Sequence, residues 1–286
     1  MKKILNDKRN LVIALFFILL FIKSFQTDFL FIIWVLAGAF ITCFADMFLV
    51  KILKKKYTFP KSAIISGVIV AGILDYHQTW FVLVIFSLVS IFSKYLIKYN
   101  SRHIFNPANF SLAIATLCGL PLTWNIEANI YIIIACGIYI AYTLKKMPHL
   151  CGFLVFFAGL FAVQGVNPLL LISWLFIFVM LIEPKTSGYG ILRGFIFGSI
   201  SGVSAFLIFK FFPQYDLFII SLFIANLFNI LLEKIKPESL SHILKFFYKS
   251  KVIGLIVKLF SGPDNLAKTH GKSGILQIQK WRVLLR

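Results

Sequence analysis

Residues 29–50 read FLFIIWVLAGAFITCFADMFLV and contain one charged side chain, that of Asp46. Residues 11–22 read LVIALFFILLFI and contain none. A helix of about 20 apolar residues is long enough to cross a lipid bilayer. Because lipid offers no hydrogen-bond partners, a segment inside it must form a helix or belong to a closed barrel. Neither stretch alternates apolar and polar residues as a barrel strand does, so both predict membrane helices.

The composition of the whole chain points the same way. Of its 286 residues, 60% are apolar and 14% are charged, and the mean hydropathy is +0.91. A soluble domain is nearer half apolar and about one quarter charged. We therefore expect an all-α membrane protein of about ten transmembrane helices. The expected spans are 10–23, 29–50, 62–74, 79–98, 108–120, 128–144, 149–164, 168–183, 194–211 and 215–233.

The basic residues predict the orientation of these spans. The net charge of +19 would also suit a nucleic-acid-binding protein, since basic chains attract phosphate. However, when successive loops are assigned to alternate sides of a membrane, 27 of the 29 Lys and Arg residues fall on one side, and only Lys23 and Lys210 on the other. Cytoplasmic loops are enriched in Lys and Arg. The pattern predicts a multi-pass protein of the cell membrane, with both termini cytoplasmic and no nucleic-acid partner.

Three of the expected spans are unusual. Segments 62–74 and 108–120 hold too few apolar residues to cross an ordinary bilayer upright, and segment 149–164 is short and contains glycine. Short or Gly/Pro-interrupted segments in both halves indicate half or broken helices around a site near the middle of the membrane. Five spans followed by five would make the halves inverted repeats, because an odd number reverses the direction of the second half.

The two ends of the chain need separate interpretation. A basic N-terminus followed by residues 11–22 is typical of a signal peptide, but no small-residue cleavage site follows, so we expect a retained span. Residues 242–260 combine Leu, Ile and Phe with lysines. This pattern predicts an amphipathic helix on the inner membrane surface, against anionic lipid, or a helix docked on a partner subunit. We thus expect a transmembrane domain, 1–233, and a cytoplasmic amphipathic helix and basic tail, 234–286.

The cysteines and the common catalytic motifs predict neither a metal site nor hydrolysis of the soluble type. None of the cysteines is paired at CxxC spacing, and all lie in or beside apolar blocks. We expect them to be small core residues rather than ligands of zinc or of an iron–sulfur cluster. The chain contains no P-loop, no HExxH and no recognisable Ser-His-Asp pattern. We therefore assign no catalytic residue and no metal ligand.

Asp46 is an acidic residue inside an expected span, where a charged side chain is unfavourable. It lies about one helical turn before Lys51. One interpretation is an acid near the membrane interface that pairs with Lys51 or Lys54. The other is a group that relays an ion or a proton, which makes Asp46 our candidate for ion coupling.

Two cytoplasmic loops hold the remaining candidate residues. In the first, His103 is followed by Asn106 and Pro107 at the start of the fifth expected span. Asn before Pro is an ordinary helix cap, but the backbone N–H groups there can also bind an anion or phosphate. The second loop, Glu183–Gly190, occupies the equivalent place in the second half, and its polar residues suit the phosphate or ring edge of a cofactor. Its candidates are Glu183, Pro184, Lys185, Thr186 and Ser187.

These loops belong to a series of motifs in a particular order. The series comprises Ser66–Leu74 with Trp80, His103–Ala108 with its Phe-Asn-Pro-Ala core, Leu120–Trp124, Ile182–Ser187, Arg193–Gly198 and Asp216–Asn226. In order and spacing, over residues 30–233, it resembles the family of related membrane subunits found in the sodium-pumping NADH:quinone oxidoreductase and in the Rnf electron-transport complexes.

The resemblance implies ten helices in two inverted halves, in a subunit of an oxidoreductase that moves Na⁺ or H⁺. Well-known members carry flavin mononucleotide (FMN), linked through its phosphate to the threonine of a Ser-Gly-Ala-Thr motif. This chain lacks that motif, because the nearest string, Ser201–Ala205, has no threonine and lies in an expected span. The resemblance therefore implies a non-covalent flavin, FMN or riboflavin, held by the two loops, with membrane lipid and the other subunits of the complex as partners.

Two other functions are compatible with the sequence. A transporter or channel-like paralogue that kept the fold and lost the redox role would account for the missing attachment motif and for the short segments. A structural or assembly subunit would need no cofactor of its own. Because a shared fold does not establish a shared function, the site has to decide among them.

Overall fold

A computed structural model describes residues 7–53, 57, 59–99, 102–187 and 190–234 of the chain. This part is mostly helical, and the strands within it are a two-residue pair, β1 (Lys98–Tyr99) and β2 (Arg102–His103). Contacts divide the chain into two units, residues 1–229 and 230–286, and the contacts described below lie in the first. The expected amphipathic helix, 242–260, and the tail after it lie outside the described residues.

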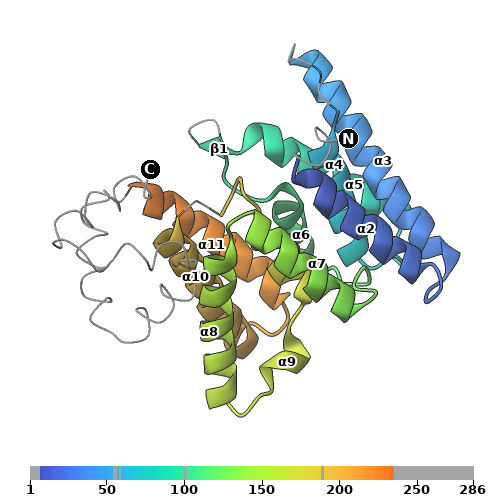
Figure 1. The fold of residues 1–286 in the computed structure, drawn as a ribbon. Coiled ribbons are helices and arrows are strands. Elements are labelled where there is room, and N and C mark those ends of the chain that lie inside the picture. Colours follow the sequence, from blue (N-terminus) through green and yellow to red (C-terminus); the bar gives the residue numbers. More distant parts are fainter. Residues whose placement is uncertain (1–6, 54–56, 58, 100–101, 188–189, 235–286) are drawn as a thin grey trace. The chain divides into compact units, whose positions relative to one another are not determined.

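The all-α class is confirmed, since a helix lies in each expected span (Figure 1). Two of the described helices, α3 and α10, are long and apolar enough to cross a membrane by length and composition. The helices are α2 (Arg9–Lys23), α3 (Phe29–Ile52), α4 (Lys61–Ile73), α5 (Trp80–Leu96), α6 (Pro107–Leu117), α7 (Ile130–Thr143), α8 (Met147–Val163), α9 (Pro168–Leu171), the π-helix η1 (Phe176–Met180), α10 (Ile191–Phe211) and α11 (Leu217–Lys234).

Helix α4 is short, as its short apolar segment predicts. Its 13 residues rise about 20 Å, and its last carbonyls are bonded by the non-helical chain that follows α6. The N–H of Thr123 donates to the carbonyl of Ile73 at 2.8 Å, and the N–H of Ile126 donates to that of Gly72 at 3.1 Å. Irregular backbone is stable in an apolar interior only where such bonds satisfy it.

The eighth expected span is broken between α9 and η1. The resumed helix is capped from elsewhere in the chain, because the carboxylate of Glu127 accepts hydrogen bonds from the hydroxyl of Ser173 and, at 3.0 Å, from the N–H of Leu175. All five residues of η1 are buried. Segment 149–164 is short, as expected, but α8 runs through it without a break, and its Gly152 lies against the carbonyl of Phe195 on α10.

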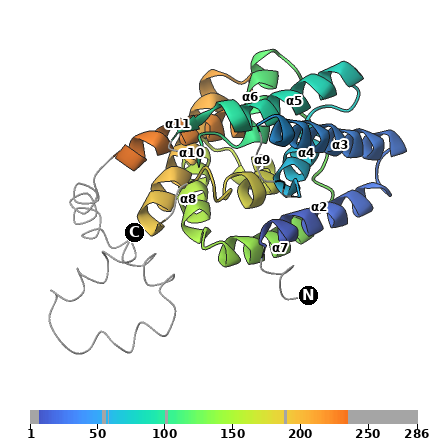
Figure 2. The ribbon, with the colours of Figure 1, turned by 90° about the horizontal axis from the view of Figure 1, so that it is seen from above.

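Helices α2–α5 and α7–α10 pack in a partly shared order. In the first set α2 packs against α4, and α3 packs against α4 and α5. In the second set α7 packs against η1, and α8 packs against α9 and α10. The leading helices of the two sets, α2 and α7, lie side by side (Figure 2). This shared order is what an internal repeat of five segments would produce.

Candidate functional site

Helix α11 brings the two predicted loops together. The ring of Phe223 stacks on that of Phe105 in the first loop, with centroids 4.4 Å apart. Six residues later, Asn229 Nδ2 donates a hydrogen bond to the carbonyl of Thr186 in the second loop, at 2.8 Å. Six helical residues rise about 9 Å. The loops, far apart in the sequence, therefore contact adjacent turns of one helix.

In the first loop, Asn106 is a helix cap. Its Oδ1 accepts hydrogen bonds from the N–H groups of Ala108 at 3.0 Å and Asn109 at 3.3 Å, and Pro107 begins α6. The capping interpretation is thus confirmed. Because the side chain of Asn106 uses two of the N–H groups at this helix end, they are not available to a phosphate.

His103, in the same loop, is an uncharged ring at neutral pH. Burial lowers its pKa to about 4, and the positive charges of Lys185, Lys98 and Lys94 act in the same direction. Its Nδ1 is buried without a hydrogen-bond partner among the described residues. The electrostatic effect of Lys185 on His103 also shows that the two loops lie near each other.

The second loop is held by its own hydroxyls. The hydroxyl of Thr186 donates to Glu183 Oε2 at 3.1 Å, and that of Ser187 donates to the carbonyl of Glu183 at 2.7 Å. Thr186 and Ser187 are buried, Glu183 and Pro184 are partly buried, and Lys185 is exposed. Of the five predicted residues of the second loop, Lys185 is therefore the one with an exposed side chain.

Lys146 and His149, at the start of α8, fasten this loop to the helix and were missed from the sequence. Lys146 Nζ donates to the hydroxyl of Ser187 at 2.9 Å, and His149 Nε2 donates to the carbonyl of Ser187 at 2.6 Å. Lys146 is fully buried, and burial lowers its pKa to about 7, with Glu183 acting in the opposite direction. The neighbouring Lys145 is exposed. The sequence does not show which of the two lysines is buried, because their burial depends on how the helices pack.

Asn109 and Asn226 were also missed. Both are fully buried, and neither side-chain amide has a hydrogen-bond partner within the described part of the chain. Asn109 lies two turns before Thr116, whose hydroxyl accepts from the N–H of Asp216, so it is on the face of α6 toward α11. Asn226 is midway between Phe223 and Asn229, one turn from each. Leaving such a group unmatched costs about 1–3 kcal/mol, so these positions favour a polar ligand.

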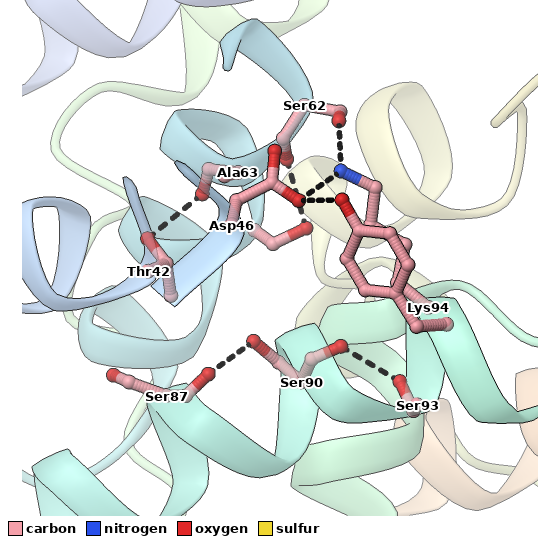
Figure 3. A network of polar contacts seen from close by, with 10 residues as sticks. Thr42, Asp46, Ser62, Ala63, Ser87, Ser90, Ser93 and Lys94 are labelled. Carbon is pink, nitrogen blue, oxygen red and sulfur yellow. Dashed lines mark hydrogen bonds and ion pairs between the residues drawn. The ribbon is translucent and has the colours of Figure 1, made fainter. Parts of the chain in front are cut away.

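Asp46 lies in a buried ion pair, shown in Figure 3. Its Oδ1 accepts hydrogen bonds from Lys94 Nζ and from the hydroxyl of Tyr95, each at 2.7 Å. The predicted pairing with Lys51 is wrong, since Lys51 is exposed, and Lys54 lies outside the described residues. Five positions along a helix turn the side chain by about 140°, so Asp46 instead faces α5.

The remaining sequence predictions concern metal and attachment sites. Ser201–Ala205 lies inside α10, and the hydroxyl of Ser201 is 3.3 Å from that of Ser221 on α11. Cys118 is exposed, so the prediction that it is a core residue is wrong, whereas Cys43 and Cys136 are partly buried and pack against the core, and Cys151 is partly buried. Across the described ranges, no three side chains of His, Cys, Asp or Glu gather as they would to hold a metal ion.

No protein-family model matches this chain, and no curated protein matches it. The family resemblance therefore rests on the motifs quoted above. The function has to be argued from the geometry that joins them.

Proposed function

We propose that this protein is a multi-pass membrane subunit of an Rnf-like electron-transport complex, in which a non-covalent flavin moves electrons in a process coupled to ion transport. One observation supports this above the others: α11 joins the two loops and carries the buried amide of Asn226, unpartnered among the described residues, on the stretch between its two contacts with them. The proposed cofactor-binding residues are His103, Asn106, Pro107, Glu183, Pro184, Lys185, Thr186 and Ser187, with Asn109 and Asn226 added from the structure.

The membrane location is supported by the outer surface of the helices. Large apolar side chains face outward, among them Phe17, Phe40 and Phe81, with 67%, 71% and 72% of their surface exposed. Soluble proteins rarely expose contiguous apolar surface on this scale, whereas lipid favours it. We infer ten spans, with the basic loops in the cytoplasm and membrane lipid around them.

The residues of the site fit the polar edge of a flavin ring. That edge carries an N–H group between two carbonyls, so it needs both acceptors and donors. Each free amide of Asn109 and Asn226 supplies one carbonyl and an NH₂ group. When bound, the flavin supplies the electron-transfer chemistry, while the protein binds, orients and excludes water.

The charges around the site assign a role to each loop. Neutral His103 can lie against an aromatic ring without adding charge. The exposed Lys185 can pair with a phosphate. The N–H groups of Ala108 and Asn109 are not available to that phosphate, because the side chain of Asn106 caps them. Lys146, buried behind Ser187, places a proton-binding amine next to the loop. The pair formed by Asp46 and Lys94 lies within electrostatic reach of Lys185 and supplies the candidate for ion coupling.

A transporter or channel-like paralogue is the second candidate, favoured by one specific observation. The chain has a short helix, α4, and a break between α9 and η1, and short or interrupted helices are typical of transporters. The lack of an attachment motif for flavin also agrees with it. In that function the buried amides would bind a transported solute.

Flavin titration of the detergent-purified full chain tests the proposal. We expect riboflavin or FMN fluorescence to be quenched on saturable binding. We expect Asn226→Leu to weaken the affinity about fivefold or more, since a lost buried hydrogen bond contributes about 1 kcal/mol or more. Asn125→Leu, in a loop away from the site, is the control. Absence of saturable binding in the wild type would favour the transporter.

A further inference from the structure

The start of α2 is tied by basic side chains to the ends of two other helices. Asp7 Oδ2 lies 2.9 Å from Arg9 Nη2 and 2.9 Å from Lys61 Nζ, so cations at the first positions of α2 and α4 share one carboxylate. Lys8 Nζ donates a hydrogen bond to the carbonyl of Thr143, the last residue of α7, at 2.7 Å. Helix α2 packs against both α4 and α7 (Figure 2). The ends of three helices therefore meet at one basic cluster.

The positive charge of this cluster exceeds its negative charge. The exposed Lys145 follows Thr143 by two positions, so the basic cluster consists of Lys8, Arg9, Lys61 and Lys145 with the carboxylate of Asp7. The hydrogen bond from Arg9 holds the pKa of Asp7 well below its ordinary value, so this carboxylate stays ionised. Among the described residues, neither Lys8 nor Lys145 forms an ion pair with an acid. The excess positive charge, together with the helix N-termini of α2 and α4, attracts an anion.

Exposed aromatic side chains indicate the depth of the cluster in the membrane. Tyr57 and Phe59 shortly precede Lys61, and Tyr142 directly precedes Thr143, and all three rings are exposed. Tyrosine is enriched where the lipid meets water. Helices α2 and α7 are apolar over most of their length beyond the cluster. The cluster therefore lies at the level of the lipid headgroups, where an anionic phospholipid presents its phosphate.

We propose that the basic cluster binds the phosphate headgroup of an anionic phospholipid at the membrane surface. Arg9 uses Nε and Nη2 on Asp7, which leaves Nη1 to donate to a phosphate oxygen. Lys8 and Lys145 add the charge that balances the phosphate. The inference rests on the membrane location in the proposed function. It does not rest on the flavin, because the cluster shares no residue with the proposed flavin site.

Thermal unfolding of the full chain in micelles of a neutral detergent tests this inference, with phosphatidylglycerol or phosphatidylcholine of the same acyl chains added. A ligand that binds only the folded state raises the Tm. We expect phosphatidylglycerol to raise the Tm in a saturable way and phosphatidylcholine to raise it less. The double variant Arg9→Gln, Lys145→Gln should need about tenfold more phosphatidylglycerol, or more, for half of the effect, because each basic residue near a headgroup adds to the attraction.

The matched control is the double variant Lys51→Gln, Lys210→Gln. It removes the same charge from exposed lysines outside the cluster and should behave as the wild type. Residues 234–286 are identical in all variants, so lipid bound to the basic tail cannot produce a difference between them. If Arg9→Gln, Lys145→Gln does not fold, Lys145→Gln and Lys51→Gln are compared singly, and only the first should weaken the effect.

Three results would overturn the inference. Equal Tm increases with the two lipids would contradict recognition of the anionic headgroup. Equal weakening in the two double variants would show that net charge alone attracts the lipid. An equal Tm increase with inorganic phosphate, at constant ionic strength and without lipid, would show a site for free phosphate. Because these titrations contain no flavin, the lipid site and the flavin proposal can fail separately.

Discussion

Asn229 Nδ2 donates a hydrogen bond to the backbone carbonyl of Thr186, 43 positions earlier in the chain, at 2.8 Å. This bond fixes the second loop to α11, one turn beyond the buried amide of Asn226. The same helix stacks Phe223 on Phe105 in the first loop. The geometry of the proposed flavin site therefore depends on α11, a helix that the sequence places in the motif series but not in the site.

Replacing Asn229 tests that dependence. Asn229→Leu leaves the carbonyl of Thr186 without its donor, which costs about 1–3 kcal/mol when the group is buried. We expect a lower Tm and a flavin affinity reduced several-fold, measured by thermal unfolding and fluorescence titration. Asn125→Leu, which loses only a bond to the hydroxyl of Thr123, should change neither. Unchanged flavin affinity in Asn229→Leu would contradict the role of α11.

The ring of His103 should make the protein less stable in acid. Its pKa in the folded chain is about 4, below the ordinary value of 6.5, so between these values the unfolded chain binds the extra proton. The Tm should therefore fall as the pH drops from about 6.5 to 4. His103→Gln should reduce this fall, and the exposed His77→Gln should not. An equal fall in both variants would contradict the assignment.

Lys146 should produce a pH dependence of the same sign as His103, but at alkaline pH. Its pKa is about 7 in the folded chain and 10.5 ordinarily, so above pH 7 the unfolded chain binds more protons. The stability of the wild type should rise from pH 7 to about 9. Lys146→Met should remove this rise, whereas Lys145→Met, at the exposed neighbour, should keep it. Thermal unfolding at several pH values measures both.

Close contact between α8 and α10 depends on Gly198. A Cβ atom there would overlap the carbonyl oxygen of His149 and lie 2.8 Å from the N–H nitrogen of Phe153. We expect Gly198→Ala to destabilise the protein by about 1–3 kcal/mol, as overpacking does. Gly159 lies on α8, and a Cβ atom added there would have no heavy atom within 4 Å. Gly159→Ala should therefore be neutral or stabilising. Denaturation in detergent compares them, and similar losses would contradict the packing.

The positions of the helices could be predicted from the apolar blocks, since each expected span contains one. The break between α9 and η1 could not, because the Leu, Ile and Phe residues on both sides of Ser173 hide it and its cap, Glu127, comes from another segment. The short length of α4 could be predicted from its short apolar segment. Break and cap are tertiary features, so a local pattern does not show them.

The site could be predicted only in part. The two loops were found by their motifs, and Asn106 behaves as a cap. The partner of Asp46 was missed because Lys94 is 48 positions away and reaches it only when α5 packs beside α3. Lys146 and Lys145 look alike in the sequence, and Asn109 and Asn226 look like ordinary polar residues in helices. Burial separates these cases, and burial depends on which helices are neighbours.

The visible absorption spectrum of the detergent-purified protein, followed by acid precipitation, tests the central proposal most directly. A non-covalent flavin predicts a flavin band that is released into the supernatant. Flavin retained in the pellet would contradict the inference that no covalent attachment site exists. A colourless protein that cannot be reconstituted with riboflavin or FMN would contradict the electron-transfer function and leave the transporter.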